Sequence, residues 1–81
     1  MFTVYVLYST KIQKKYTGFT QDLEKRIIQH NLGLLGKYTK GKGPWVLIYS
    51  ETFQTKIEAI VKEKELKTGK GRDFLKLKTG Y

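Results

Sequence analysis

The chain contains no cysteine, and among its 81 residues there is only one histidine. Without cysteine the protein can form neither a disulfide nor a thiolate zinc site, and one histidine excludes a metal centre built from several imidazoles. Domains of this size bury only about 60% of the surface of the unfolded chain. We therefore expect a single domain over residues 1–81, stabilised by its aliphatic and aromatic side chains.

Long apolar segments are also missing. No stretch of the sequence approaches the length that spans a bilayer, and the first residues, Met1-Phe2-Thr3-Val4, lack the basic start of a signal peptide. We therefore expect a cytoplasmic protein without a membrane partner.

Acidic residues are scarce relative to basic ones. The chain has 16 Lys and Arg against 7 Asp and Glu, which gives a formal net charge of +9. Such a surface attracts polyanions, and nucleic acid is the foremost candidate. The alternative is that the charge serves only solubility, until a site indicates otherwise.

Three segments have the pattern of β-strands. Apolar and polar residues alternate from Phe2 to Ser9, and a second strand is predicted around Lys15 to Phe19. The third, Trp45 to Phe53, opens as a nearly continuous apolar run, which predicts a strand covered on both faces.

Helices are predicted after the second and third strands. Thr20 or Gln21 caps a helix that runs to about Asn31 and ends near Gly33, and a capping box, Thr55 to Glu58, starts another that runs to about Lys67. Gly69 and Gly71 are expected to break that helix before a short last one over Arg72 to Lys78. The order ββαβα(α) predicts an α/β (α+β) domain with a three-stranded antiparallel sheet flanked by helices.

A glycine lies within the second strand, in the stretch KYTGFT (residues 15 to 20). If the first two strands form a hairpin centred between Thr10 and Lys11, Tyr5 lies opposite Tyr16, with Gly18 on the same face. A glycine there would leave an opening that a ligand can approach. The alternative is that the two tyrosines form an ordinary stabilising cross-strand pair.

The predicted helices carry polar residues at the edges of their apolar faces. Arg26 and His30 border the apolar face of the first helix, and Glu63 borders that of the second. A carboxylate at the edge of a core is costly unless a cation faces it. Structural alternatives are ion pairs of Arg26 with Asp22 and of Glu63 with Lys67.

The segment from Gly36 to Pro44 is rich in lysine and glycine. Lys37, Lys40 and Lys42 are candidates for contacts with the phosphates of a nucleic-acid backbone, since neighbouring glycines allow close approach. A solvated loop is the alternative.

Four segments together resemble the GIY-YIG nuclease family: VYV at 4–6, YTG at 16–18, EKRIIQHN at 24–31 and EKELK at 63–67. The chain looks most like small standalone bacterial members related to the nuclease domain at the N-terminus of the bacterial repair excinuclease. The resemblance implies five catalytic residues, the last of which binds the divalent metal, Mg²⁺ or Mn²⁺: Tyr5, Tyr16, Arg26, His30 and Glu63.

The resemblance also implies roles for these residues. Tyr5 would be the general base, Tyr16 would position the water or the phosphate, and Arg26 would bind phosphate oxygens. His30 would assist the base or hold a phosphate oxygen. Gly18, with the three lysines of the loop, would contact nucleic acid.

The implied function is a metal-dependent DNA endonuclease that hydrolyses phosphodiester bonds in DNA repair or recombination. We expect DNA as the partner, a protein partner that supplies specificity, and a monomer or weak homodimer. The main alternative is a non-catalytic nucleic-acid-binding module, because no asparagine follows Glu63 where many family members have one. A protein-interaction domain is a third class.

Overall fold

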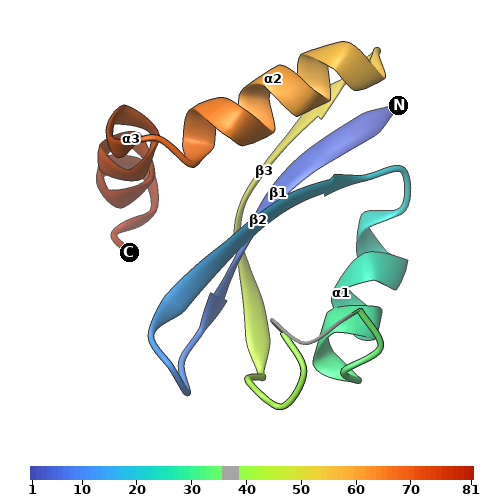
Figure 1. Cartoon of the computed structure of the whole chain (residues 1–81), viewed down its shortest axis with the longest axis vertical. Helices are drawn as coiled ribbons and strands as arrows, with labels where there is room; N and C mark the ends of the chain where they lie inside the picture. Colours follow the sequence, from blue (N-terminus) through green and yellow to red (C-terminus); the bar gives the residue numbers. More distant parts are fainter. Residues whose placement is uncertain (36–38) are drawn as a thin grey trace.

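A three-stranded antiparallel sheet with strand order β2-β1-β3 forms the centre of the molecule. The computed structural model describes residues 1–35 and 39–81 (Figure 1). The elements follow one another along the chain in the order ββαβαα, which confirms the predicted α+β fold. The elements are β1 (Phe2–Ser9), β2 (Lys14–Thr20), α1 (Leu23–Asn31), β3 (Trp45–Phe53), α2 (Lys56–Leu66) and α3 (Gly69–Thr79).

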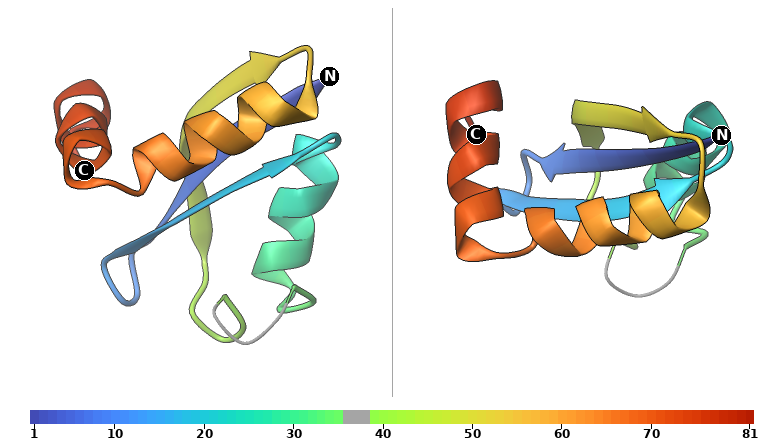
Figure 2. Two further views of the ribbon diagram at one scale, coloured as in Figure 1. Left: turned by 45° about the horizontal axis from the view of Figure 1, so that its top comes forward. Right: turned by 90° about the horizontal axis from the view of Figure 1, so that it is seen from above.

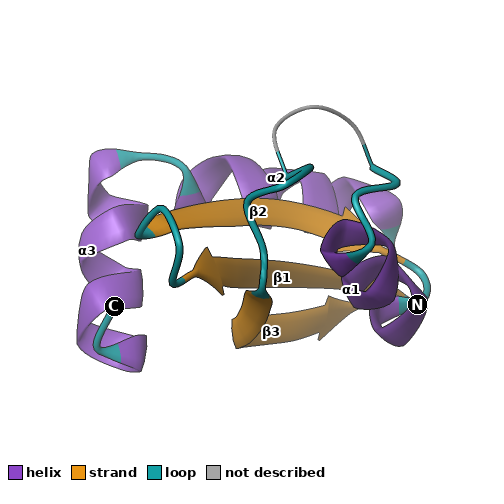
Figure 3. Ribbon diagram, turned by 90° about the horizontal axis from the view of Figure 1, so that it is seen from below, coloured by secondary structure: helices purple, strands orange, loops and turns teal. Residues whose placement is uncertain are grey.

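The central strand, β1, is covered on both faces. Val4 and Val6 point to one face, where they pack against residues of α2 and α3: Ala59, Leu66 and Leu75. Tyr5 and Leu7 point to the other, where they pack against Trp45 and the α1 residues Leu23 and Ile27. Figure 2 and Figure 3 show that the sheet separates α1 from α2 and α3. The alternation predicted for β1 therefore becomes two separate apolar clusters.

The prediction that both faces of β3 are covered is wrong. This strand pairs only with β1 and forms an edge of the sheet, and Val46 and Leu47 remain 48% and 37% exposed. An apolar run shows that a segment favours burial but not which neighbours it acquires. The strand covered on both faces is β1, whose pattern is alternating.

The predicted hairpin register is also wrong. Tyr5 pairs with Gly18, and Tyr16 pairs with Leu7. The turn between the strands reaches Gln13, which has a left-handed φ of 54° and whose N–H donates to the Ser9 carbonyl at 2.8 Å. This longer turn moves the pairing by two residues, so each side chain keeps its predicted face but changes its partner.

Helix ends follow the expected capping chemistry, with one shift. Asp22, rather than Thr20 or Gln21, is the N-cap of α1, because its side chain accepts from the N–H of Lys25. Gly33, at φ 74°, follows the end of α1 as predicted. The capping box of α2 is confirmed in both of its hydrogen bonds.

The prediction that Gly69 and Gly71 separate two helices is only partly right. Thr68 is the N-cap of α3, so both glycines lie in the first turn of this helix. A Cβ atom on Gly71 would overlap the backbone of Glu65 and Leu66 in α2, whereas one on Gly69 would meet nothing within 4 Å. The close approach of α3 to the end of α2 therefore requires glycine at position 71.

Within the described residues, no helix has the length and apolar character needed to cross a bilayer.

We expect Gly71→Ala to destabilise the protein by about 1–3 kcal/mol, because the added methyl group overpacks the junction of the two helices. Gly69→Ala is the matched control, and it should leave stability unchanged or raise it by about 0.4–1 kcal/mol. Chemical unfolding of both variants checks this. Equal stability of the two would contradict the proposed junction.

Candidate active site

Four polar side chains on the α1 side of the sheet form a group that we call the polar cluster: Tyr5, Tyr16, Arg26 and His30. Tyr5 lies at its centre. Its side chain is only 1% exposed, and its hydroxyl lies 3.0 Å from Nε2 of His30. His30 is in the last turn of α1 and is also 1% exposed. A strand and a helix that are distant in sequence therefore join two buried polar groups through one hydrogen bond.

The other ring nitrogen of His30 has a partner from the loop before β3. Nδ1 lies 3.1 Å from Oγ1 of Thr39, a residue that is 1% exposed. The Thr39 carbonyl accepts from Nε1 of Trp45 at 3.1 Å, and the backbone N–H of Trp45 donates to the Asn31 side chain at 2.7 Å. Thr39 is therefore held in place and orients the imidazole. The sequence gives no signal for this residue, because one threonine among lysines and glycines has no pattern of its own.

Tyr16 joins the cluster as a diagonal neighbour of Tyr5. Its ring centroid lies 6.4 Å from that of Tyr5 and 4.8 Å from that of His30. The sequence prediction that the two phenols share a face is correct, although they are not directly paired.

Gly18 does not provide the opening that the sequence suggested. A Cβ atom at this position would lie 2.9 Å from the Tyr5 hydroxyl oxygen and 3.3 Å from Cε2 of Tyr16. Gly18 is buried, and the Tyr5 ring occupies the space above it. The glycine therefore makes room for the phenol of its strand partner, and the contact of Gly18 with nucleic acid stays a prediction.

Arg26 acts on the same hydroxyl from α1. Burial raises the pKa of Tyr5, and the guanidinium opposes this rise. Its positive charge also adds to the effect of burial in lowering the pKa of His30. The alternative ion pair with Asp22 does not form among the described residues, where Asp22 instead caps the helix through Lys25. The charge of Arg26 therefore acts on Tyr5 and His30 and is not paired with Asp22 within the described residues.

Glu63 approaches from α2. Its side chain is 19% exposed, and Oε2 lies 3.0 Å from Nζ of Lys67, so the ion pair weighed as an alternative does form. The carboxylate is nevertheless close enough to raise the pKa of Tyr5. Glu63 therefore acts on Tyr5 through its charge and already has a cation beside it.

A metal at this site would be held by few protein ligands. Among residues 1–35 and 39–81, no three His, Asp or Glu side chains gather in an arrangement suited to one ion. A single carboxylate that already faces an ammonium group suits a cation such as Mg²⁺, which commonly uses one or two carboxylates plus water and phosphate oxygens. Glu63 is the residue that would hold it.

The surroundings set the protonation states of the two central groups. Burial raises the pKa of Tyr5 well above its ordinary value, Tyr16 and Glu63 raise it further, and Arg26 opposes the shift. Burial lowers the pKa of His30, and the charge of Arg26 lowers it further. At neutral pH the resting site therefore holds a protonated phenol and a neutral imidazole.

The lysine-rich loop lies partly outside the described residues, and this includes Lys37. Lys40 is exposed and Lys42 is half-buried. Ser9 donates a hydrogen bond to the Lys42 carbonyl, and Lys11 donates to the Gly41 carbonyl at 2.9 Å. The described end of this loop is thus attached to the β1–β2 hairpin, and its contact with phosphates stays a prediction.

The fold and the site together define a class of protein. It is a small α+β domain with two neighbouring tyrosines, an arginine, a histidine and a glutamate. Residues 1–76 match the family model described as the GIY-YIG catalytic domain. The chain belongs to the GIY-YIG family.

Similar proteins include several named UPF0213. One from Staphylococcus saprophyticus is 52% identical over 62 residues, which is 76% of each chain. One from Clostridium perfringens is 48% identical over 64 residues, 79% of this chain and 68% of the relative. The solution NMR structure of a UPF0213 protein from Bacillus halodurans is 37% identical, has a TM-score of 0.60, and covers 99% of this chain and 88% of that one.

The buried histidine predicts a pH dependence of stability. Because the pKa of His30 is lowered in the folded protein, the unfolded chain binds the proton more readily, so stability is lost as pH falls below the ordinary histidine value of about 6.5. The loss should be at most about 1.4 kcal/mol per pH unit.

His30→Gln is the informative variant, because the chain has no other histidine. Chemical unfolding between about pH 7.5 and pH 5.5 should show a smaller decline for the variant than for the natural chain. An identical decline in both proteins would show that other groups cause it.

Proposed function

We propose that the protein is an endonuclease that hydrolyses phosphodiester bonds of DNA and depends on a divalent metal. Membership of the GIY-YIG family supports a nuclease, and the formal net charge of +9 supports a polyanionic substrate. The observation that carries the proposal is the buried Tyr5 hydroxyl, which hydrogen-bonds to the imidazole of His30. Burial raises the pKa of this hydroxyl, and the charge of Arg26 opposes the rise.

The contacts of Tyr5 suit it to act as a general base with assistance. In the required tautomer, Nδ1–H of His30 donates to Thr39, and Nε2 accepts the Tyr5 proton. As the Tyr5 oxygen takes a proton from the attacking water, its own proton passes to His30, and the hydroxide bonds to phosphorus. The bond from phosphorus to the leaving oxygen breaks in the same displacement, and that oxygen takes a proton from solvent water. The raised pKa of Tyr5 keeps the base protonated at rest, so the transfer to His30 is needed for activity.

Arg26 has two tasks in this scheme. Its guanidinium stabilises negative charge on the Tyr5 oxygen, and its planar donors can bind oxygens of the scissile phosphate. Tyr16 lies beside both Tyr5 and His30, where it can position the water or the phosphate. These residues supply orientation and electrostatic stabilisation of the charge that develops on phosphorus.

Glu63 would hold the divalent metal, Mg²⁺ or Mn²⁺, which supplies stabilisation of the leaving oxygen when it is bound. Lys67 occupies the cation position on this carboxylate in the structure. We infer that Lys67 leaves Glu63 when the metal binds.

A second function is favoured by one feature. No asparagine follows Glu63, and Lys67 already neutralises this carboxylate. A nucleic-acid-binding module without catalytic activity would have the same fold and charge. If the protein does cleave DNA, we place its role in DNA repair or recombination, with a protein partner that directs it.

Glu63→Gln is expected to abolish metal-dependent cleavage while the fold and DNA binding persist. The amide keeps the size of the side chain but removes the charge that holds a cation. Glu65→Gln is the matched control, because it removes one carboxylate from the same helix and that carboxylate pairs with Lys62 instead.

Cleavage of labelled duplex, nicked and branched DNA, with and without Mg²⁺ or Mn²⁺, tests this prediction. Full activity of Glu63→Gln, or cleavage that needs no metal, would contradict the mechanism. If the natural chain binds these substrates but cuts none of them, the binding module is the better description.

Tyr5→Phe should lower the rate of cleavage by about 10²- to 10⁴-fold, the usual contribution of a general base. It should also cost about 1–3 kcal/mol of stability, because Nε2 of the buried His30 loses its partner. Tyr49→Phe is the control. It removes a tyrosine hydroxyl from the other face of the sheet, where this hydroxyl donates a hydrogen bond to the Glu51 carboxylate.

Rates measured under single-turnover conditions, beside unfolding curves, separate the two effects. Cleavage by Tyr5→Phe at the rate of the Tyr49→Phe control would mean that Tyr5 is structural only.

A further inference from the structure

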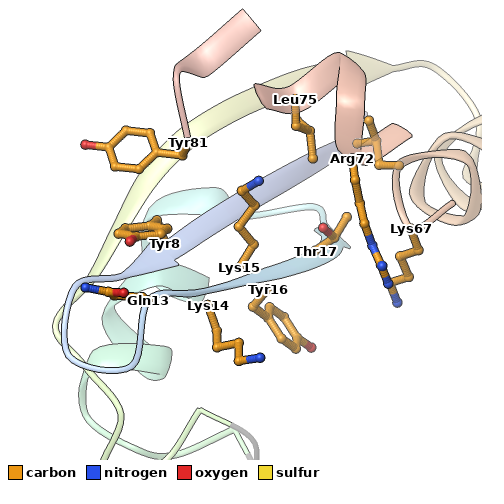
Figure 4. A pocket seen from close by; sticks show the side chains of 11 residues that line it. Tyr8, Gln13, Lys14, Lys15, Tyr16, Thr17, Lys67, Arg72, Leu75 and Tyr81 are labelled. Atoms are coloured by element: carbon orange, nitrogen blue, oxygen red, sulfur yellow. The ribbon is translucent and has the colours of Figure 1, made fainter. Parts of the chain in front are cut away.

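A groove of about 900 Å³ borders the polar cluster and shares one residue with it, Tyr16. It runs between the outer edge of β2 and the end of the molecule formed by α2 and α3 (Figure 4). Lys15 and Thr17 point from β2 toward α3, while Lys14 and Tyr16 leave the opposite face of the strand. Because β2 is an edge strand, the groove passes around this edge from one face of the sheet to the other.

The charge of the groove has one sign. Four cations contribute to its lining, and the lining residues include no Asp or Glu: Lys14, Lys15, Lys67 and Arg72. Within the described parts of the chain, Lys14, Lys15 and Arg72 form no salt bridge. Their charge is therefore available to an anionic ligand rather than neutralised by neighbouring carboxylates.

Aromatic rings lie among these cations. Tyr8 and Tyr81 have ring centroids 4.5 Å apart at the far end of the groove, and Tyr16 lies at the near end. Figure 4 shows Tyr81 next to Tyr8, with Lys15 between this pair and Arg72. Proteins that bind single-stranded nucleic acid combine these two features: cations that follow the backbone, and aromatic rings on which unpaired bases stack.

The groove meets the candidate active site at two residues. Tyr16 belongs both to the groove and to the polar cluster, and Lys67 lines the groove while its ammonium group pairs with Glu63. A strand that occupies the groove would therefore be continuous with one whose phosphate lies at Tyr5. A duplex keeps its bases stacked inside, where Tyr8 cannot reach them.

We propose that this groove binds single-stranded DNA that leaves the cleavage site, so that the substrate is DNA with an unpaired arm beside the scissile bond. The part that concerns the substrate rests on the proposed nuclease function. The part that concerns binding does not, because it can be measured without cleavage.

Binding is measured with a metal chelator present, using a short fluorescent single strand of mixed sequence and a blunt duplex. The groove variant, Lys14→Gln/Lys15→Gln/Arg72→Gln, is compared with the control variant, Lys25→Gln/Lys56→Gln/Lys64→Gln. Both variants lose three charges, but the control residues are exposed and do not line the groove.

For the groove variant we expect the slope of log affinity against log salt for the single strand to be smaller by about 2, since each phosphate contact contributes about 0.7. The control variant should keep the natural slope for this probe. An equal loss in both variants would overturn the proposal, since only the total charge would then matter.

Tyr8→Leu tests the aromatic part separately and keeps an apolar side chain. It should lower affinity for the single strand by roughly five- to 150-fold if one base stacks on the ring, and Tyr8→Phe should restore it. Unchanged affinity of Tyr8→Leu would overturn stacking at this position. Tighter binding of an RNA of the same sequence would overturn DNA as the ligand.

Cleavage then tests the substrate. In the presence of metal, the natural chain should cut a duplex with an unpaired arm faster than a blunt duplex, and the groove variant should lose this preference. If the natural chain cuts no DNA, the nuclease function fails, while the chelator measurements still decide the groove. If it cuts blunt and armed duplexes equally, the proposed substrate is wrong.

Discussion

The hydrogen bond between the Tyr5 hydroxyl and Nε2 of His30 is the constraint on which the rest of the site depends. Both groups are buried, so an unpaired partner on either side would be costly. Keeping this bond requires a glycine at position 18, where any side chain would press on the phenol, and a threonine at position 39, which occupies the other imidazole nitrogen. Chemistry and packing therefore impose the same requirement on these residues.

Strand β1 makes this arrangement possible because it is central. One of its faces supplies Val4 and Val6 to the apolar cluster beneath α2 and α3, and the other supplies Tyr5 and Leu7 to the cluster beneath α1. Successive residues of a strand point to opposite faces, so each catalytic candidate on β1 is flanked by core residues. The position of Tyr5 is thus set by the packing of its two sequence neighbours.

The Glu63–Lys67 pair connects the polar cluster with the groove along β2. The half-buried carboxylate is stabilised by the ammonium group one turn further along α2, and Lys67 itself lines the groove. If a metal took the position of the ammonium group, the charge of Lys67 would be released toward the groove. Occupation of the two sites would then be coupled through one side chain.

Much of this protein could be predicted from residues that act locally. The alternation of β1, the capping box from Thr55 to Glu58 and the helix end near Gly33 depend on neighbours in sequence, and the structure confirms them. The spacing of Tyr5, Tyr16, Arg26, His30 and Glu63 was enough to indicate the family, because regular elements of predictable length carry all five.

Only the tertiary structure decided the features that depend on contacts between distant segments, namely the strand register and the partners of the site residues. The length of the turn that ends at Gln13 set the register, and the register placed Gly18 beneath Tyr5 rather than beside an opening. Burial against α1 and the loop before β3 brought Thr39 to His30, and the approach of α3 to α2 demanded Gly71. Sequence by itself determined which residues are the candidates for the chemistry and on which elements they lie. The contacts that these residues make were decided by long-range packing. Packing energies depend on segments that are distant in the sequence, and no local pattern shows which of these segments come together.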